Sequence, residues 1–164
     1  MHGNGIVIDF EGRLDLGFSQ IGYLEIKDFK IINVCEKTDI KDKRDVILDR
    51  FLRKKNDFLV AHHHTTEKNF LKKEMPYTNI TKTGVWGPWL DTEIIYKKLY
   101  PQIKNYKLEN LSKEFLNLEH VSNEVRNYSP ESEVNFHNPL YDAFCCYHLA
   151  KRLITSINLN KMFV

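Results

Sequence analysis

The sequence has little that would tie the protein to an oxidising compartment or to a membrane. It contains three cysteines, two of them the adjacent Cys145 and Cys146, and an odd number of thiols makes a poor disulfide framework. No basic, apolar start typical of a signal peptide precedes Asp9, and no apolar run approaches the roughly 20 residues of a membrane span. We therefore expect a cytoplasmic protein with no membrane partner.

A strong net charge is also missing. The chain has 24 Lys and Arg against 22 Asp and Glu, so a general polyanion-binding surface is excluded and any contact with nucleic acid must be local. The 164 residues are 42% hydrophobic, enough for one domain with a sizeable core, and no repeat or linker divides them. We expect one domain over residues 1–155 and a C-terminal tail over 156–164.

Hydrophobic periodicity predicts an α/β fold with a mixed sheet flanked by helices. Strands are expected at 5–10, at 20–28 and 29–36 as a hairpin, at 58–61 and at 89–90. Helices are expected at 41–55, 64–74, 91–100, 107–116 and 139–154, with polar, turn-rich chain at 119–136. This pattern alone permits many functions, so the chemistry must come from individual sites.

Two acidic residues, Asp9 and Glu11, end the first apolar strand. Because strand side chains alternate, residues two apart lie on the same face and can share a divalent cation. Unpaired carboxylates there would repel each other and lose hydration, whereas Mg²⁺ or Mn²⁺ would remove that conflict. The pair by itself is a weak signal, because such acids are common at exposed strand ends.

A histidine and an aspartate mark the start of the final helix. His137 lies just before it and Asp142 lies in its first two turns, which suits a mobile general base beside a fixed metal ligand. The alternative is an acid that stabilises the helix dipole beside an exposed histidine. Glu67, early in the predicted helix 64–74, could face the same cleft.

The run His62-His63-His64 invites a zinc interpretation. Consecutive side chains diverge, however, and no Cys, His or Asp pattern completes a tetrahedral set, so zinc is disfavoured here.

Taken together, these three segments resemble the DnaQ-like exonucleases of the DEDD type with a catalytic histidine. That family includes proofreading subunits such as the epsilon subunit of DNA polymerase III, and small DNA and RNA exonucleases. The resemblance rests on Asp9-Phe10-Glu11, on Ala61-His62 with Phe70-Leu71, and on His137 with Asp142-Ala143. Glu67 stands where the family usually has aspartate.

The resemblance implies a ribonuclease H-like fold, with a five-stranded mixed sheet and helices on both faces. It implies that Asp9, Glu11, Glu67 and Asp142 hold two Mg²⁺ or Mn²⁺ ions and that His137 accepts a proton from the attacking water. The activity implied is removal of nucleoside 5′-monophosphates from a 3′ end.

The expected partner is the 3′ end of single-stranded DNA or RNA. Phe10, Gly12, Leu14, His62 and His63 are the candidate substrate-binding residues, with Gly12 allowing close backbone approach. A polymerase subunit as partner and a homodimer both stay open, as does the choice between DNA and RNA. The competing function is a DnaQ-like nucleic-acid-binding or polymerase-associated module whose catalysis is weakened.

Overall fold

A computed structural model describes residues 2–40, 56–74 and 87–164 of the chain. Its centre is a five-stranded mixed sheet with the order β3-β2-β1-β4-β5. The strands are β1 (Asn4–Arg13), β2 (Gly17–Lys27), β3 (Lys30–Lys37), β4 (Phe58–Ala61) and β5 (Trp89–Asp91). The first three pair antiparallel, whereas β4 and β5 run parallel to β1, which confirms the predicted mixed sheet.

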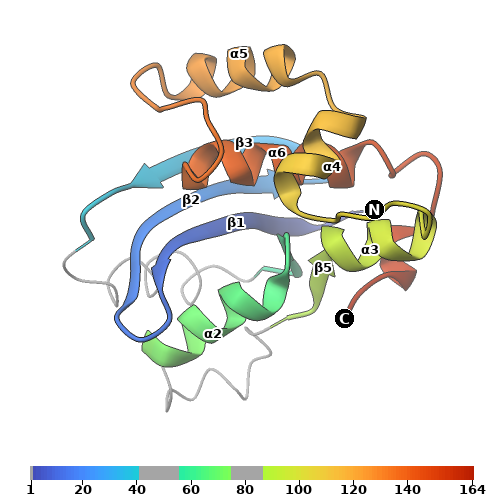
Figure 1. Ribbon diagram of the computed structural model, residues 1–164, viewed down its shortest axis with the longest axis horizontal. Helices are drawn as coiled ribbons and strands as arrows, with labels where there is room; N and C mark the ends of the chain where they lie inside the picture. The colour runs from blue at the N-terminus through green and yellow to red at the C-terminus, as the bar shows by residue number, and fades with distance from the viewer. Residues whose placement is uncertain (1, 41–55, 75–86) are drawn as a thin grey trace.

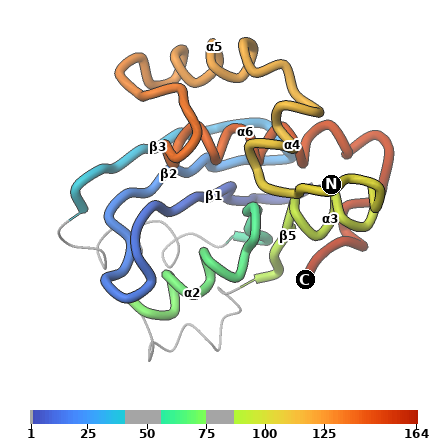
Figure 2. Tube along the Cα trace, in the orientation of Figure 1, coloured from blue at the N-terminus to red at the C-terminus, as the bar shows by residue number. Residues whose placement is uncertain are grey.

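The helices are α2 (His64–Glu74), α3 (Thr92–Leu99), α4 (Leu108–Phe115), α5 (Leu118–Tyr128) and α6 (Pro139–Lys151). Helix α6 lies along the sheet and contacts β1 and β2, while α4 and α5 pack on its outer side (Figure 1). Helix α2 contacts β1, β2 and β4 and lies well away from α6 in the tube view (Figure 2). The sheet is therefore covered by helices on both faces, as predicted.

Side-chain alternation along β1 divides the interior into two hydrophobic cores. Val7 belongs to the core formed with α6, whereas Ile6, Ile8 and Phe10 belong to the core that includes Phe70 of α2. Asp9, two residues beyond Val7, lies on the α6 side of the strand by the same alternation. The register of β1 thus determines which helix the acidic pair can meet.

The segment 119–136 was predicted to be polar and turn-rich, and this prediction is wrong for its first part. Residues 118–128 form α5, capped by the side chain of Asn117, which accepts a hydrogen bond from the His120 amide at 3.1 Å. Val121 and Val125 are the buried face of this helix, one turn apart and packed toward α6. Two apolar residues and one capping residue are a weak sequence signal for a helix in a segment where most residues are polar.

Near the C-terminus, α6 ends at Lys151, three residues before the predicted end. Residues 156–164, expected as a tail, pack against the sheet: Leu159 is buried, and Phe163 forms a β-bridge with Leu90. The predicted helix at 41–55 lies outside the described residues. Among the helices that are described, none is long and apolar enough to cross a membrane.

Candidate active site

The acidic pair of β1 is brought against the start of α6 by a glycine on the neighbouring strand. Asp9 lies directly opposite Gly22 of β2 in the strand register. A Cβ added to Gly22 would lie only 2.2 Å from the backbone nitrogen of Leu140 and from the carbonyl carbon of Pro139. Helix α6 can therefore approach the sheet here because residue 22 has no side chain.

Asp142 lies in the first turns of α6, which begins in a well-defined way. Asn138 caps the helix by accepting a hydrogen bond from the Tyr141 amide at 2.9 Å, and Pro139 occupies the first turn. The Oδ2 atom of Asp142 accepts a hydrogen bond from the backbone N–H of His137 at 3.1 Å. Its Oδ1 atom is buried and has no hydrogen-bond partner among residues 2–40, 56–74 and 87–164.

His137 projects from the loop that precedes α6. Its side chain is 87% exposed, and its Nδ1 atom lies 3.9 Å from Oε1 of Glu11. Its backbone has a positive φ of 70°, an uncommon conformation for a residue with a side chain. The loop is held in that conformation partly by the bond from the His137 amide to Asp142. The structure therefore brings His137 together with Glu11 of β1 and Asp142 of α6.

Glu67 joins this cluster from α2. Its side chain is buried, and Oε2 accepts a hydrogen bond from the backbone N–H of Phe10 at 3.1 Å. That amide lies between Asp9 and Glu11 in the sequence, so the bond places the Glu67 carboxylate beside the acidic pair. The longer side chain of glutamate thus spans from α2 to the end of β1.

The four carboxylates destabilise one another's charged forms. Burial, and then repulsion from Glu67, Asp142 and Glu11, raises the pKa of Asp9 well above its ordinary value. Burial likewise raises the pKa of Glu11 and that of Glu67, and it raises the pKa of Asp142 to about 7. Such a cluster of buried and half-buried acids needs either protons or a cation at neutral pH.

These residues fit a divalent cation. Ligand atoms of Glu11, His137 and Asp142 all lie within 4.8 Å of one another. The buried Oδ1 of Asp142 has no partner within the described part of the chain, and a bound Mg²⁺ or Mn²⁺ would satisfy it. Asp9 and Glu67 interact electrostatically with the same acids and would add two more carboxylates to this set of metal ligands. Oxygen-rich donor sets of this kind suit Mg²⁺ and Mn²⁺.

The pKa of Asp142 leads to a prediction for the stability of the metal-free protein. A carboxyl group whose pKa is higher in the folded protein than in the unfolded chain binds more protons when folded, so stability is lost as pH rises between the two values. In EDTA, the free energy of unfolding should fall by a few kcal/mol as the pH rises from about 4 to about 7. The lower limit is the ordinary pKa of an aspartate and the upper limit is the pKa of Asp142 in the folded protein. Thermal melts at several pH values in EDTA measure this slope.

Mg²⁺ or Mn²⁺ should abolish the loss of stability at neutral pH, because the cation replaces the protons. Asp142→Asn should reduce the slope in EDTA, since it removes one of the four carboxyl groups whose pKa is raised. An equal slope in wild type and Asp142→Asn would contradict this account of the site.

A pocket of about 400 Å³ opens next to Asp142 and His137. His62 and His63, predicted to bind substrate, both line it, together with Tyr106, Leu108 and Phe136. The Nε2 atom of His62 donates to the Tyr106 carbonyl at 2.8 Å, and Nδ1 lies 2.9 Å from the Thr92 hydroxyl. Burial lowers the pKa of His62 despite the nearby Asp91 and Glu93, so the ring stays neutral.

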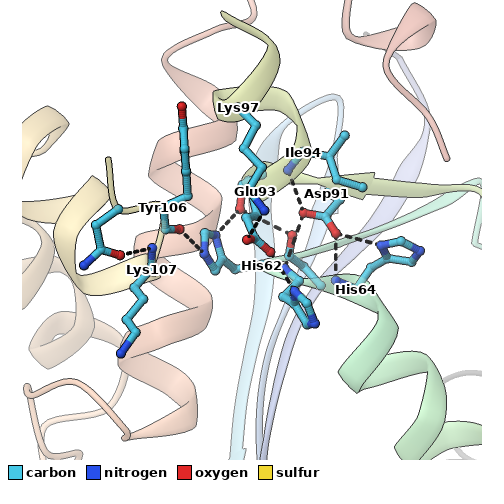
Figure 3. Close-up of polar contacts among 12 residues, drawn as sticks. His62, His64, Asp91, Glu93, Ile94, Lys97, Tyr106 and Lys107 are labelled. Carbon is cyan, nitrogen blue, oxygen red and sulfur yellow. Dashed lines mark hydrogen bonds and ion pairs between the residues drawn. The ribbon is translucent and has the colours of Figure 1, made fainter. Parts of the chain in front are cut away.

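The rings of the three consecutive histidines bond to different residues, and Figure 3 labels His62 with its partner Tyr106 and His64 with its partner Asp91. The ring of His62 bonds to Tyr106 and Thr92, that of His63 to Glu93 at 2.6 Å, and that of His64 to Asp91 at 2.7 Å. The rings diverge, as the sequence predicted.

Asp91 organises this turn, a role that its position in the sequence does not indicate. Its carboxylate accepts hydrogen bonds from the backbone amides of His63, His64 and Ile94 and from the His64 ring. Burial alone would raise the pKa of Asp91, but the hydrogen bonds from His64 and Ile94 outweigh it and hold the pKa below its usual value. The sequence predicts a helix start at Asp91. Its hydrogen bonds to residues at the start of α2 form because β5, which ends at Asp91, pairs in parallel with β4.

Three predicted substrate-binding residues are placed differently from His62 and His63. The Phe10 ring is buried against Phe18 and Phe70 in the α2-side core, so its side chain faces away from the acids. Gly12 allows a close approach, but of the hairpin backbone: an added Cβ would lie 2.6 Å from the Gly17 carbonyl oxygen. Leu14 is exposed near the tip of this hairpin.

Substitution of Gly22 should separate α6 from the acidic pair. Gly22→Ala is expected to lower the free energy of unfolding by about 3 kcal/mol, the upper end of overpacking costs, because the added carbon meets backbone atoms. It should also weaken stabilisation by Mn²⁺, since Asp142 moves with α6. The measurement is the Mn²⁺-induced rise in Tm.

Gly5→Ala is the matched control. Its added carbon would meet the Phe58 ring at 2.4 Å, so it should also destabilise the sheet. Gly5 lies at the opposite end of β1 from the acids, and the response to Mn²⁺ should therefore persist. Equal responses in the two variants would contradict the proposed role of Gly22.

The comparisons with known proteins bear on the fold. No protein-family model and no curated protein matches the sequence. The chain is similar to a solved structure of exonuclease X in complex with 5′-overhanging duplex DNA, with a TM-score of 0.63 and 20% sequence identity over 96% of each chain. The likeness covers the whole arrangement of sheet and helices. The fold is thus the ribonuclease H-like fold that the family resemblance implied.

Proposed function

We propose that the protein is a metal-dependent 3′-to-5′ exonuclease of the DnaQ-like type, with His137 as its general base. The main support is the convergence of four carboxylates, from β1, α2 and α6, on one place beside an exposed histidine. The likeness in fold to an exonuclease agrees with this proposal. Asp9, Glu11, Glu67 and Asp142 would hold two Mg²⁺ or Mn²⁺ ions.

Bound metal would supply activation of water and stabilisation of the leaving 3′ oxygen. The chain's own residues have separate tasks. Asp142 uses one oxygen to hold the His137 loop and keeps the other free for a cation. His137 would accept the proton of the attacking water, and its exposure on a loop allows it to release that proton to solvent.

The pocket beside Asp142 is the proposed site for the terminal nucleotide. Tyr106 and Phe136 provide aromatic surface for a base, and Lys107 provides positive charge near its rim. His63 is 60% exposed and could donate to a phosphate or a sugar hydroxyl. Neutral His62 supports the wall by its bond to the Tyr106 carbonyl.

A weakened, nucleic-acid-binding module is the competing proposal, and Glu67 is the residue that favours it. One of its oxygens is already engaged by the Phe10 amide, which leaves Oε1 for metal. Under that alternative the pocket would still bind a 3′ end, but turnover would be negligible.

Hydrolysis of labelled oligonucleotides tests the proposal. Single-stranded DNA and RNA carrying a 5′ label should be shortened stepwise from the 3′ end with Mg²⁺ or Mn²⁺, and not with EDTA. A matched oligonucleotide whose 3′ end is blocked should resist digestion, whereas a blocked 5′ end should have no effect. The product analysis should show nucleoside 5′-monophosphates.

Binding without digestion under either metal would reject the enzyme and support the binding module. Digestion from the 5′ end would reject the proposed polarity. The comparison of DNA with RNA also decides the sugar preference.

The proposal also includes the location of the protein in the cell and its partners. We propose a cytoplasmic location on the basis that Cys35, Cys145 and Cys146 are free thiols. Association with a polymerase subunit and formation of a homodimer remain expectations of the family resemblance, and size-exclusion chromatography with light scattering tests the second.

A further inference from the structure

We propose that His120, Glu124 and His148 form a zinc-binding site that links α5 to α6. The site shares no residue with the candidate active site, so it stands independently of the proposed exonuclease function. Its ligand atoms all lie within 4.8 Å of one another. None of these residues was singled out from the sequence.

The geometry suits a single metal ion. His120 and Glu124 are four residues apart on α5, so their side chains lie on one face of the helix, and His148 approaches from α6. The Oε2 atom of Glu124 lies 2.7 Å from Nε2 of His148 and 3.8 Å from Nε2 of His120. Ligands about 2.1 Å from a tetrahedral Zn²⁺ lie about 3.4 Å apart, so small side-chain rotations complete the set.

The two histidines differ in exposure, which gives the site both rigidity and access. The side chain of His148 is 14% exposed and that of Glu124 22%, whereas that of His120 is 70% exposed. The inner two ligands are therefore held by packing, and His120 can close over an ion that enters from solvent. A water molecule would complete the coordination on the open side.

The contact between the two inner ligands marks where the metal would bind. Nε2 of His148 and Oε2 of Glu124 lie 2.7 Å apart, and Zn²⁺ would take the place of the proton between them, with the remaining ring proton on Nδ1. The Nζ atom of Lys151 lies over the Tyr147 ring, 5.0 Å from the centroid.

The composition of the site selects the metal. Two imidazoles and one carboxylate suit Zn²⁺, whereas Mg²⁺ prefers oxygen ligands and would bind weakly here. Excess Mg²⁺ can therefore be used to occupy the acidic cluster while Zn²⁺ is titrated. This separates the two sites in one experiment.

Zinc would join the start of α5 to the end of α6, at the ends of these helices that lie away from their connecting segment. Residues 129–138 connect these helices and carry His137. The helices already pack together without metal, because Val121 and Val125 are buried and the Tyr128 ring lies 5.8 Å from the Phe144 ring. The protein should therefore be folded without zinc and become more rigid with it.

Titration of the whole protein with Zn²⁺ in excess Mg²⁺ tests the proposal. One equivalent should bind, and at a concentration 100 times the Kd it should raise Tm by about 5 to 10 °C. Long-range proton–nitrogen NMR correlations of the histidine rings should show the Nε2 atoms of His120 and His148 moving to the metal-bound range. Co²⁺ in place of Zn²⁺ should give the visible absorption of a tetrahedral site.

His120→Ala is the main variant, because its exposed side chain can be removed without disturbing the fold. It should weaken Zn²⁺ binding at least tenfold, and Glu124→Gln should do the same, while His2→Ala, which removes an exposed histidine elsewhere, should not. Loss of less than twofold in His120→Ala, or unchanged ring nitrogens at saturating Zn²⁺, would overturn the proposal and leave Glu124 and His148 as a hydrogen-bonded pair only.

Discussion

Replacing Asp9 with asparagine should lower the rate of oligonucleotide hydrolysis by about 1000-fold and at the same time stabilise the metal-free protein. The first effect follows because metal ions contribute several kcal/mol to stabilising the transition state, and Asp9 is a buried acid surrounded by the three other carboxylates of the cluster. The isosteric amide keeps the shape of the side chain but loses its negative charge.

The gain in stability has a separate cause. At neutral pH the wild-type protein must either ionise Asp9 against burial and three neighbouring carboxylates or keep it protonated. An amide avoids both penalties, so Asp9→Asn should melt at a higher temperature than wild type in EDTA at pH 8. Mn²⁺ should reverse the order, because it stabilises the wild-type cluster more.

Melting curves and single-turnover rates on the same preparations measure the two effects. Glu114→Gln, an exposed acid on α4, is the control and should change neither. A variant that is inactive and also less stable in EDTA would indicate misfolding instead of the loss of a metal ligand, and would contradict the electrostatic account.

The sequence was informative where a functional residue is fixed by local structure. Alternation on β1 predicted that Asp9 and Glu11 share a face, and a helix that starts at Pro139 was predicted to carry Asp142. Those arguments need only the strand period and the chemistry of a helix start. Placing the two elements side by side needed the family resemblance, because the close contact depends on Gly22 of a third element.

Roles that depend on contacts between distant segments were not predictable. Asp91 bonds to the backbone of residues 63 and 64 because β5 pairs with β4, and nothing near Asp91 in the sequence indicates that partner. Phe10 was grouped with the acids by its position between them, whereas alternation sends its ring to the other core. The zinc candidate likewise combines α5, which was read as a turn-rich segment, with α6.

His137→Asn should lower kcat by about 100-fold to 1000-fold, the range for removing a general base, and leave metal binding intact. Asparagine is chosen because it tolerates the positive φ at this position better than alanine, so the loop keeps its backbone conformation. The histidine side chain is 87% exposed and contributes little packing, so Tm should change by less than about 2 °C.

His63→Asn gives the matched comparison, since His63 also has a positive φ and lines the same pocket. The His63 ring bonds to Glu93 and not to the four carboxylates of the proposed metal site. Its loss should therefore raise KM, while kcat stays within a few-fold of the wild-type value. Added imidazole should restore part of the activity of His137→Asn and none of that of Asp9→Asn, because a free base replaces a proton acceptor but not a metal ligand. If kcat of His137→Asn falls by less than tenfold and imidazole does not rescue it, His137 is a metal ligand or a positioning group. The attacking water would then give its proton to another acceptor.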